Sequence, residues 1–493
     1  MSATVGMTLL PLGPVAAIVA GAVMILVLEL FPVFEAGRLK TWVALVAAVA
    51  SAGLTVSLWS VPPWHGMGIG ESGRWLVEFS RMYRVDHATL GLYLAIAVFT
   101  ALTVVFLDMG YRRSDVRGEV LALTLFIASG MMILVSAESL VMVFLGLELL
   151  SVPLYVVVSS FTHDRHACEA SLKYFLFGAL GSVLLLLGIA LVYAQTGSLS
   201  FPVIQARIPQ ILQAPDGNPA LLFGSMALIT VALAFKLGIA PFHMWLPDTY
   251  QGAPSAVTGF MGSAVKLAGF GLALRIFWEM YLPLADHWRG LLTLLAVITM
   301  FVGNLGALVQ DNLKRMFAYS SIAHAGFLLL GLAALPKGGN PGAIYYYLVV
   351  YGLMFVGFFA LLALLEQQSR SLEIYQLSGM GFSHPVTGLA LAVFALSGAG
   401  IPPTAGFLAK YFVFADAIAG GRTLAVVLAL VTSLVGAFYY LRVVVYLYMR
   451  EAKAPVAVPA RAYPVAYACA LACAVALVFF TIFPSPLGIM AIR

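Results

Sequence analysis

The feature that most constrains this chain is a succession of apolar runs, each about 20 residues long and without polar alternation. Within a lipid bilayer every backbone N–H and C=O group must be satisfied inside the protein, so a spanning segment is either a helix or a strand of a closed barrel. Barrel strands are about ten residues long and alternate in polarity, whereas runs of about 20 apolar residues match spanning helices. The sequence therefore predicts an all-α polytopic membrane protein.

Composition excludes the main alternatives. Hydrophobic residues make up 62% of the chain and charged residues 10%, whereas average soluble domains have roughly 45–50% and about 25%. A soluble globular protein and a nucleic-acid-binding protein are both excluded, despite the net charge of +5. Three cysteines are too few for a disulfide scaffold or a cysteine-ligated cluster.

We expect about fourteen spans. They cover residues 14–34, 41–61, 86–107, 118–137, 139–161, 168–194, 220–246, 254–278, 290–310, 315–335, 343–365, 386–416, 423–448 and 464–483. The longest polar connections are expected at 62–85 and 195–219, and no soluble domain is expected. No cleavable signal peptide is expected, because the first span lacks a basic flank and Glu29 stands near the place of a cleavage site.

The basic residues predict the orientation. With the N-terminus outside, 12 of the 26 lysines and arginines fall in inner loops, 8 fall on the outer side and the rest lie within spans. Short cytoplasmic loops are enriched in lysine and arginine. We therefore expect both termini on the outer side of the membrane.

Four ionisable residues lie deep within predicted spans, where a charge costs about 2.5–3.5 kcal/mol on insertion scales. They are Glu148, Lys236, Lys266 and Lys410. One carboxylate cannot neutralise three lysines, so some of the lysines must be neutral part of the time or share protons through water. The pattern indicates proton handling; the alternative is a structural ion pair between Glu148 and one lysine.

Two spans are interrupted by the same pattern, Gly-Ile-x-Pro. It occurs at 238–241, with Pro241, and again at 400–403, with Pro402 and Pro403. Proline lacks an amide donor and breaks a helix, and the freed carbonyls need water or side chains. Transporters built from inverted repeats place such broken helices at the ion site. A simple bend of each helix is the other interpretation.

Other polar residues accompany these charges. His243 follows Lys236 by seven positions, and His324 lies within span ten beside two serines. Histidine titrates near neutral pH and passes protons through either nitrogen, although a lone histidine often only packs. Glu169 and Lys173 have the favourable i,i+4 order near the inner end of span six, where they predict either a surface pair or a proton uptake path.

Three segments resemble the antiporter-like subunits of respiratory complex I. They are residues 235–248 (FKLGIAPFHMWLPD), 312–326 (NLKRMFAYSSIAHAG) and 400–410 (GIPPTAGFLAK). The core is also similar to subunits of multisubunit cation/proton antiporters and of membrane-bound hydrogenases. Residues 248–258 (DTYQGAPSAVT) are similar to the subunit-N branch of the family. The basic residue Lys410, and the absence of a long lateral helix after the last span, agree with that branch.

The resemblance implies a role for each matching position. Glu148 would pair with Lys236 on broken span seven, Lys266 would be the central connecting lysine, and Lys410 would serve the outward half-channel on broken span twelve. His243 and His324 match histidines of the central polar axis. Strict repeat symmetry is not met, because Lys236 precedes its break whereas Lys410 follows its own.

The resemblance also implies an organisation into four parts. Residues 1–117 would hold three helices, 118–278 and 290–448 two inverted five-helix repeats, and 449–493 a last helix. The chain would lie in a bacterial plasma membrane beside other complex I membrane subunits, sibling antiporter-like subunits among them.

The implied activity is proton translocation by a subunit of an NADH–quinone oxidoreductase. No metal, cofactor or redox centre is expected in this chain; NAD, flavin, iron–sulfur clusters and quinone are expected in partner subunits, and no nucleic acid is expected. The alternatives are a subunit of a cation/proton antiporter or a membrane-bound hydrogenase, and a non-pumping scaffold whose buried charges only hold helices together.

Overall fold

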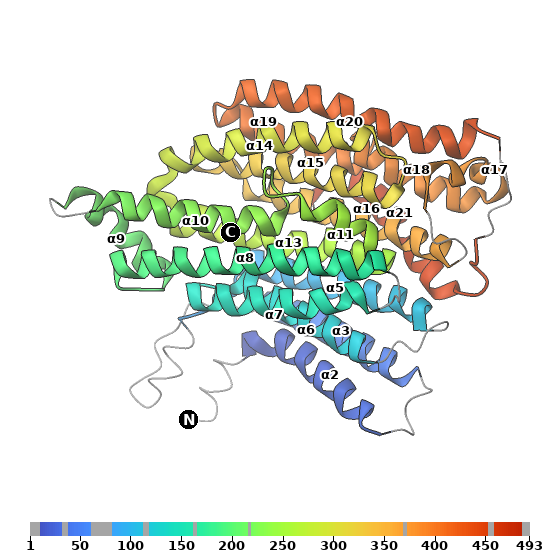
Figure 1. Ribbon diagram of the computed structural model, residues 1–493, viewed down its shortest axis with the longest axis horizontal. Helices are drawn as coiled ribbons and strands as arrows, with labels where there is room; N and C mark the ends of the chain where they lie inside the picture. Colours follow the sequence, from blue (N-terminus) through green and yellow to red (C-terminus); the bar gives the residue numbers. More distant parts are fainter. Residues whose placement is uncertain are drawn as a thin grey trace.

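The computed structural model describes residues 10–31, 38–60, 81–111, 118–160, 165–214, 218–367, 372–451 and 458–485. Within these ranges the chain is helical and contains no β-strand, only three isolated bridges. Among the described residues, thirteen helices are long and apolar enough to cross a membrane, and most of them lie roughly side by side (Figure 1). The predicted all-α polytopic fold is confirmed.

The long and medium helices have the following bounds. They are α2 (Gly13–Glu29), α3 (Leu39–Ser57), α5 (His87–Tyr111), α6 (Glu119–Ser136), α7 (Leu140–Ser159), α8 (Arg165–Thr196), α9 (Phe201–Gln213), α10 (Pro219–Leu237), α11 (Trp245–Gly252), α12 (Ser255–Phe260), α13 (Lys266–Leu274), α14 (Ala285–Leu308), α15 (Leu313–Ala334), α16 (Pro341–Glu366), α17 (Met380–Ser383), α18 (Pro385–Ala399), α19 (Ala405–Ala419), α20 (Thr423–Met449) and α21 (Pro464–Ile482). Short 3₁₀ turns are η1 (Leu10–Leu12), η3 (Leu58–Ser60), η7 (Leu282–Leu284), η8 (Leu335–Lys337) and η9 (Ile374–Leu377). Two π-helical turns are η5 (Met261–Val265) and η6 (Arg275–Met280).

Two predicted spans are each divided into two helices. Span seven consists of α10 and α11, and span twelve consists of α18 and α19. In each case a glycine follows the first helix in the left-handed conformation, Gly238 at φ 69° and Gly400 at φ 74°. Glycine is the residue that adopts this conformation without a Cβ penalty, and the prolines that follow cannot continue a helix. Local sequence therefore dictates both breaks.

One connection differs from the sequence prediction. Residues 195–219, expected to be a polar loop, contain α9. Phe201, Ile204 and Ile208 are buried on one side of this helix, a spacing that follows the helical period. The hydrophobic stripe is too short for a span but long enough to pack an amphipathic helix against the bundle.

The centre of the bundle is the segment from α12 to η6. Its most apolar 18-residue stretch is completely buried and those of α15 and α16 are 94% buried, whereas those of α8 and α21 are only 28% buried. A π-helical turn stands directly before Lys266 and another follows α13. π-Helical turns are rare in proteins, and those that occur often lie at functional sites. Lys266 thus lies in the most enclosed span, beside a local irregularity of the helix.

The bundle has two distinguishable ends. The loop before α5 lies beside the loop between α6 and α7, because Tyr83 forms a bridge with Ala137. We call this end of the bundle the Arg84 end, and α9 lies at it, at the left of Figure 1. The opposite end carries the start of α8 and α15, where Lys173 and Arg315 both contact Asp248. We call it the Lys173 end.

Candidate functional site

Glu148 and Lys236 lie near one another but do not form the ion pair that the family resemblance implies. Glu148 lies half-buried on α7 and accepts a hydrogen bond from Ser182 of α8. Lys236, in the last turn of α10, donates instead to the Ser151 hydroxyl at 2.9 Å and to the Tyr174 hydroxyl at 3.2 Å. Ser151 is one turn after Glu148 on α7, so the lysine contacts the same helix as the carboxylate without bonding the carboxylate itself. The functional pairing of Glu148 with Lys236 stays a prediction.

A small cavity lies beside Lys236. It is lined by fourteen residues of α7, α8, α10 and α11, among them Ser151, Tyr174, Ser182 and Lys236. Its lining is mostly apolar, and its volume is sufficient for a water molecule. Ser182 bonds Glu148 and lines the same cavity as Lys236.

Lys266 lies at the start of α13 and is almost completely buried. Its ammonium donates to both the hydroxyl and the backbone carbonyl of Ser321 on α15. The nitrogen also lies 5.4 Å from the centre of the Tyr351 ring, within cation–π range. Neutral oxygens and an aromatic face, rather than a carboxylate, hold this lysine.

His324 lies one turn further along α15 within a row of hydroxyls. Its Nδ1 is 2.7 Å from the Tyr347 hydroxyl, and its Nε2 is 3.1 Å from the Tyr440 hydroxyl. The Tyr440 hydroxyl also contacts the hydroxyl of Ser320, the residue before the serine that holds Lys266. These groups form a polar row on α15 that reaches from Lys266 to His324.

Lys410 caps the broken helix that precedes it. Its nitrogen donates to the carbonyls of Gly398 at 3.2 Å and Ala399 at 2.8 Å, and to the Ser433 hydroxyl at 3.0 Å. These are the last carbonyls of α18, which have no helical partner because the chain turns at Gly400. The negative end of a helix dipole favours a cation at this place. Lys410 thus depends on the break for its acceptors.

The break after Gly238 in span seven has different contacts from the break after Gly400. This agrees with the sequence, in which Lys236 precedes its break whereas Lys410 follows its own. At the end of α10 the Phe235 carbonyl accepts from the Trp245 indole at 2.9 Å. This carbonyl accepts from the Gly238 N–H as well as from the indole, and Lys236 bonds across to α7 and α8. The two breaks share backbone geometry while their lysines make different contacts.

The structure places His243 away from the lysines. It lies half-buried in the turn between α10 and α11, and its Nδ1 is buried without a hydrogen-bond partner. Neither ring nitrogen contacts a described lysine or carboxylate. Its role as a relay residue stays a prediction.

Glu169 and Lys173 form an i,i+4 ion pair at 2.7 Å, and Lys173 also bonds Asp248 of α11 at 2.8 Å. Asp248 in turn bonds Arg315 at 2.6 Å. Sequence reasoning missed Asp248 and Arg315 as members of this cluster, although both lie within the segments that carry the family resemblance. The cluster is half-exposed at the Lys173 end and reaches α11, the second half of span seven.

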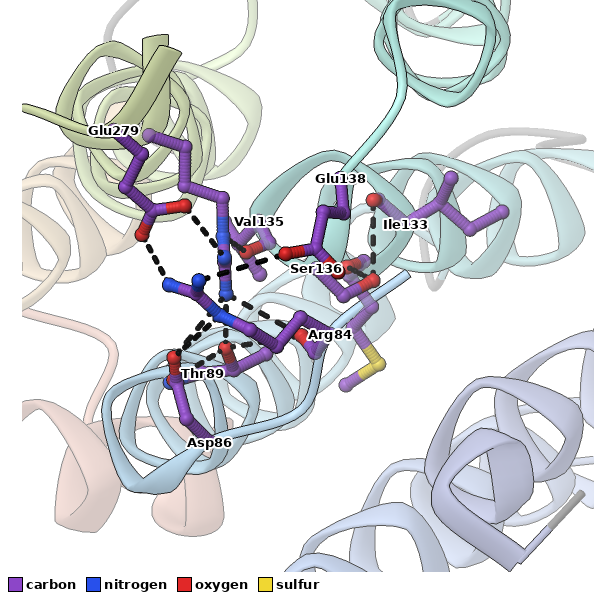
Figure 2. Close-up of polar contacts among 10 residues, drawn as sticks. Arg84, Asp86, Thr89, Ile133, Val135, Ser136, Glu138 and Glu279 are labelled. Atoms are coloured by element: carbon purple, nitrogen blue, oxygen red, sulfur yellow. Dashed lines mark hydrogen bonds and ion pairs between the residues drawn. The ribbon is translucent and has the colours of Figure 1, made fainter. Parts of the chain in front are cut away.

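A second charged cluster, at the Arg84 end, was also missed (Figure 2). Arg84 bonds Glu279 and lies 3.1 Å from Asp86 and 3.6 Å from Glu138. Arg275 donates to the Val135 carbonyl at the end of α6 and contacts both Asp86 and Glu279. The only sequence signal was the i,i+4 spacing of Arg275 and Glu279 at the end of span eight. This cluster ties α5, α6 and η6 together.

Asp86 precedes the first residue of α5 and accepts a hydrogen bond from the Thr89 backbone N–H at 2.8 Å. Burial alone would raise the pKa of this carboxyl, but the guanidinium groups of Arg275 and Arg84 outweigh it and lower the pKa to about 2. Asp86 is therefore ionised at neutral pH, where it can pair with both guanidinium groups.

Known proteins resemble this chain in both fold and sequence. Residues 137–436 match the family described as "NADH:quinone oxidoreductase/Mrp antiporter, TM", which is more than half of the chain. The chain belongs to this family. The match includes Glu148, Lys236, Lys266, Lys410 and both helix breaks, and it confirms the resemblance seen in the sequence.

Individual relatives agree with the family match. The chain is 36% identical to NADH-quinone oxidoreductase subunit N of Laribacter hongkongensis over 90% of this chain and 89% of that protein. It is 41% identical to the subunit N of Salinibacter ruber over 75% and 74% of the two chains.

Solved structures agree as well. A chain of respiratory complex I from Thermus thermophilus is 32% identical, with a TM-score of 0.78 over 97% of this chain and 99% of that one. A chain of the Mrp complex from Dietzia sp. has the same TM-score at 20% identity, over 98% of this chain and 96% of that one, and shares the fold alone.

Proposed function

We propose that this chain is a membrane-arm subunit of an NADH–quinone oxidoreductase and that it moves protons across a bacterial plasma membrane, driven by quinone reduction in other subunits. One observation carries the proposal: Lys236, Lys266 and Lys410 lie inside spans, and among the described residues each amine donates to neutral oxygens only. A buried ammonium without a carboxylate is costly, so its proton can be displaced by a modest change in the surrounding charge.

The proposed route starts at the Lys173 end, which the distribution of basic residues assigns to the inner side. Glu169 and Lys173 would collect protons there, and Lys236 would receive them under the influence of Glu148. The proton would continue through Lys266 and the polar row on α15.

The outward part of the route would run through His324 and Lys410. Lys410 faces the carbonyls that the break at Pro402 and Pro403 leaves free. Irregular backbone at membrane depth is tolerated where it is buried in protein or borders a water-filled cavity, so we expect water beside this break. The break after Gly238 would serve the inner half of the route in the same way.

The energy for this transport must come from neighbouring subunits. Moving one elementary charge against about 100 mV costs about 2.3 kcal/mol, and in this proposal the redox reaction that supplies this energy takes place in other subunits. NAD, flavin, iron–sulfur clusters and quinone would be held by the partners. Two inverted repeats, 118–278 and 290–448, would form the transporting core between the first three helices and the last.

The test compares substitutions of Lys236 in the assembled complex reconstituted into vesicles. We expect Lys236→Ala and Lys236→Arg both to reduce quinone-coupled proton uptake strongly, because arginine keeps its charge but cannot release a proton. Lys337→Ala, at an exposed turn, is the matched control and should pump normally.

A scaffold role would give the opposite ranking, with arginine tolerated and alanine disruptive. Normal pumping by an assembled Lys236→Ala complex would refute the proposal. Proton uptake that requires sodium ions would favour the antiporter alternative.

A further inference from the structure

Two adjacent residues of α8 connect the half-exposed cluster at the Lys173 end with the buried lysine of span seven. Lys173 bonds Asp248 at 2.8 Å. Tyr174, the next residue, places its hydroxyl 3.2 Å from the Lys236 nitrogen. Tyr174 is therefore a buried residue that bonds Lys236 and directly follows a member of the charged cluster.

The Tyr174 ring is held in one orientation. It stacks on the Trp245 indole with centroids 4.6 Å apart and an interplanar angle of 20°, and it meets Tyr155 edge-on at 4.8 Å. Trp245 is itself fixed, because its indole N–H donates to the Phe235 carbonyl. The stacked Trp245 and the edge-on Tyr155 thus hold the Tyr174 ring with its hydroxyl toward Lys236.

Lys236 has one donor more than it has hydrogen-bond acceptors among the described residues. A lysine ammonium carries three N–H groups, and Lys236 bonds two hydroxyls, those of Ser151 and Tyr174. Both hydroxyls and the lysine line the same cavity, which has room for a water molecule. A proton that reaches this cavity finds the Tyr174 hydroxyl next to the amine.

A hydroxyl suits a relay better than the neighbouring charges do. It donates one proton and accepts through two lone pairs, so it can receive a proton from water and release its own in one concerted step. The permanently charged Arg315 at the mouth of the path cannot do this. Among the two hydroxyls, only Tyr174 belongs to the helix that also carries Glu169 and Lys173.

We propose that Tyr174 relays protons between cavity water and Lys236, a proposal that rests on the function proposed above for Lys236. A hydronium ion in the cavity gives a proton to the Tyr174 oxygen while the phenol O–H proton passes to the neutral amine. Water and a lysine ammonium result, the phenol is neutral before and after, and rotation of the hydroxyl restores the starting orientation. The reverse step empties Lys236 by the same atoms.

The experiment measures quinone-coupled proton uptake by the assembled complex in vesicles, in H₂O and in D₂O. Tyr174→Phe keeps the ring and its stacking on Trp245 but removes the hydroxyl. We expect a loss of roughly tenfold or more in the rate of uptake, together with a changed solvent isotope effect, since proton relays contribute factors of this size or larger. Tyr346→Phe removes another buried hydroxyl, which donates to the Phe480 carbonyl, and should leave both quantities unchanged.

Each outcome bears on the proposal. Normal uptake by Tyr174→Phe would overturn it, and so would a slowed variant with the wild-type isotope effect and pH profile, which indicates a structural role. If Tyr174→Phe fails to assemble, a more acidic fluorinated tyrosine at the same position should shift the pH profile of uptake, and an unchanged profile would overturn the relay. Lys236→Ala separates the two proposals: loss of pumping there with normal pumping by Tyr174→Phe refutes the relay alone, whereas normal pumping by Lys236→Ala refutes the function on which it rests.

Discussion

Replacing Gly400 with alanine tests whether the second helix break positions the amine of Lys410. Gly400 has φ 74°, and a Cβ built there would lie 2.8 Å from Cδ and 2.9 Å from Nζ of Lys410. Carbon atoms pack at about 3.5–4.0 Å, so the lysine side chain must move by about 1 Å. That movement takes the nitrogen away from the Gly398 and Ala399 carbonyls.

Two costs follow from this geometry. The left-handed conformation costs a non-glycine residue about 1–2 kcal/mol, which lowers the stability of the protein. A displacement of about 1 Å in a reacting group can reduce a rate by about 100-fold, so we expect proton uptake to fall between roughly 10-fold and 100-fold. The loss of pumping should therefore exceed anything that the loss of stability explains.

Gly421→Ala is the matched control. Gly421 has φ 77°, and its added Cβ would meet no atom within 4 Å. Both variants should lose similar thermal stability, measured by thermal unfolding of the detergent-solubilised complex, but only Gly400→Ala should lose quinone-coupled proton uptake in vesicles. Equal pumping by the two variants would refute the argument that the break serves Lys410.

Three further predictions concern the charged groups. Glu148→Gln, which keeps the shape and removes the charge, should assemble and lose most of its proton uptake; wild-type uptake would contradict a role for this carboxylate. Lys410→Ala should impair uptake whereas Lys410→Glu should retain part of it, because a carboxylate also exchanges protons there; normal uptake by the alanine variant would place the outward path elsewhere. Asp86, whose pKa is lowered from 3.8 to about 2, should contribute about 2 kcal/mol of stability that is present above pH 4 and lost as the pH falls toward 2. In thermal unfolding, Asp86→Asn should therefore be less stable than wild type at pH 7 and nearly equal to it near pH 2, and an equal difference at both would be inconsistent with the ionised state.

The spans and both helix breaks could be predicted because their causes are local. A run of about 20 apolar residues specifies a membrane helix by itself, and Gly238 or Gly400 followed by proline ends a helix whatever surrounds it. The buried lysines were equally visible, since a charge inside such a run is conspicuous. These features depend on the properties of single segments.

Features that depend on which segments meet could not be predicted. Ser151 and Tyr174, rather than Glu148, hold Lys236 because of how α7, α8 and α10 pack, and serines and tyrosines are common in membrane helices. The cluster at Arg84 joins residues far apart in the chain, among them Glu138. α9 was missed because its apolar stripe is too short to register as a span.

The basic residues fall into two groups by their contacts: those that bond carboxylates at the ends of the bundle, and the lysines in its middle. At the Arg84 end and the Lys173 end, arginines and lysines contact carboxylates: Arg84 bonds Glu279, Arg315 bonds Asp248, and Lys314 bonds Glu366 at 2.9 Å. Lys314 also donates to the carbonyl that ends α11, and Glu366 accepts the first N–H of α12, so these pairs fix helix ends.

The lysines in the middle of the bundle have no such partner among the described residues. Two hydroxyls and an aromatic ring hold Lys236, and hydroxyls, carbonyls and an aromatic ring hold Lys266 and Lys410. An ion pair holds its proton firmly because losing it strands a buried carboxylate, whereas a lysine among neutral oxygens loses a proton without leaving an unpaired charge. The ion pairs at the two ends therefore hold the helices in place. In the proposed function the central lysines gain and lose protons, and a proton path through a rigid bundle requires both kinds of charge.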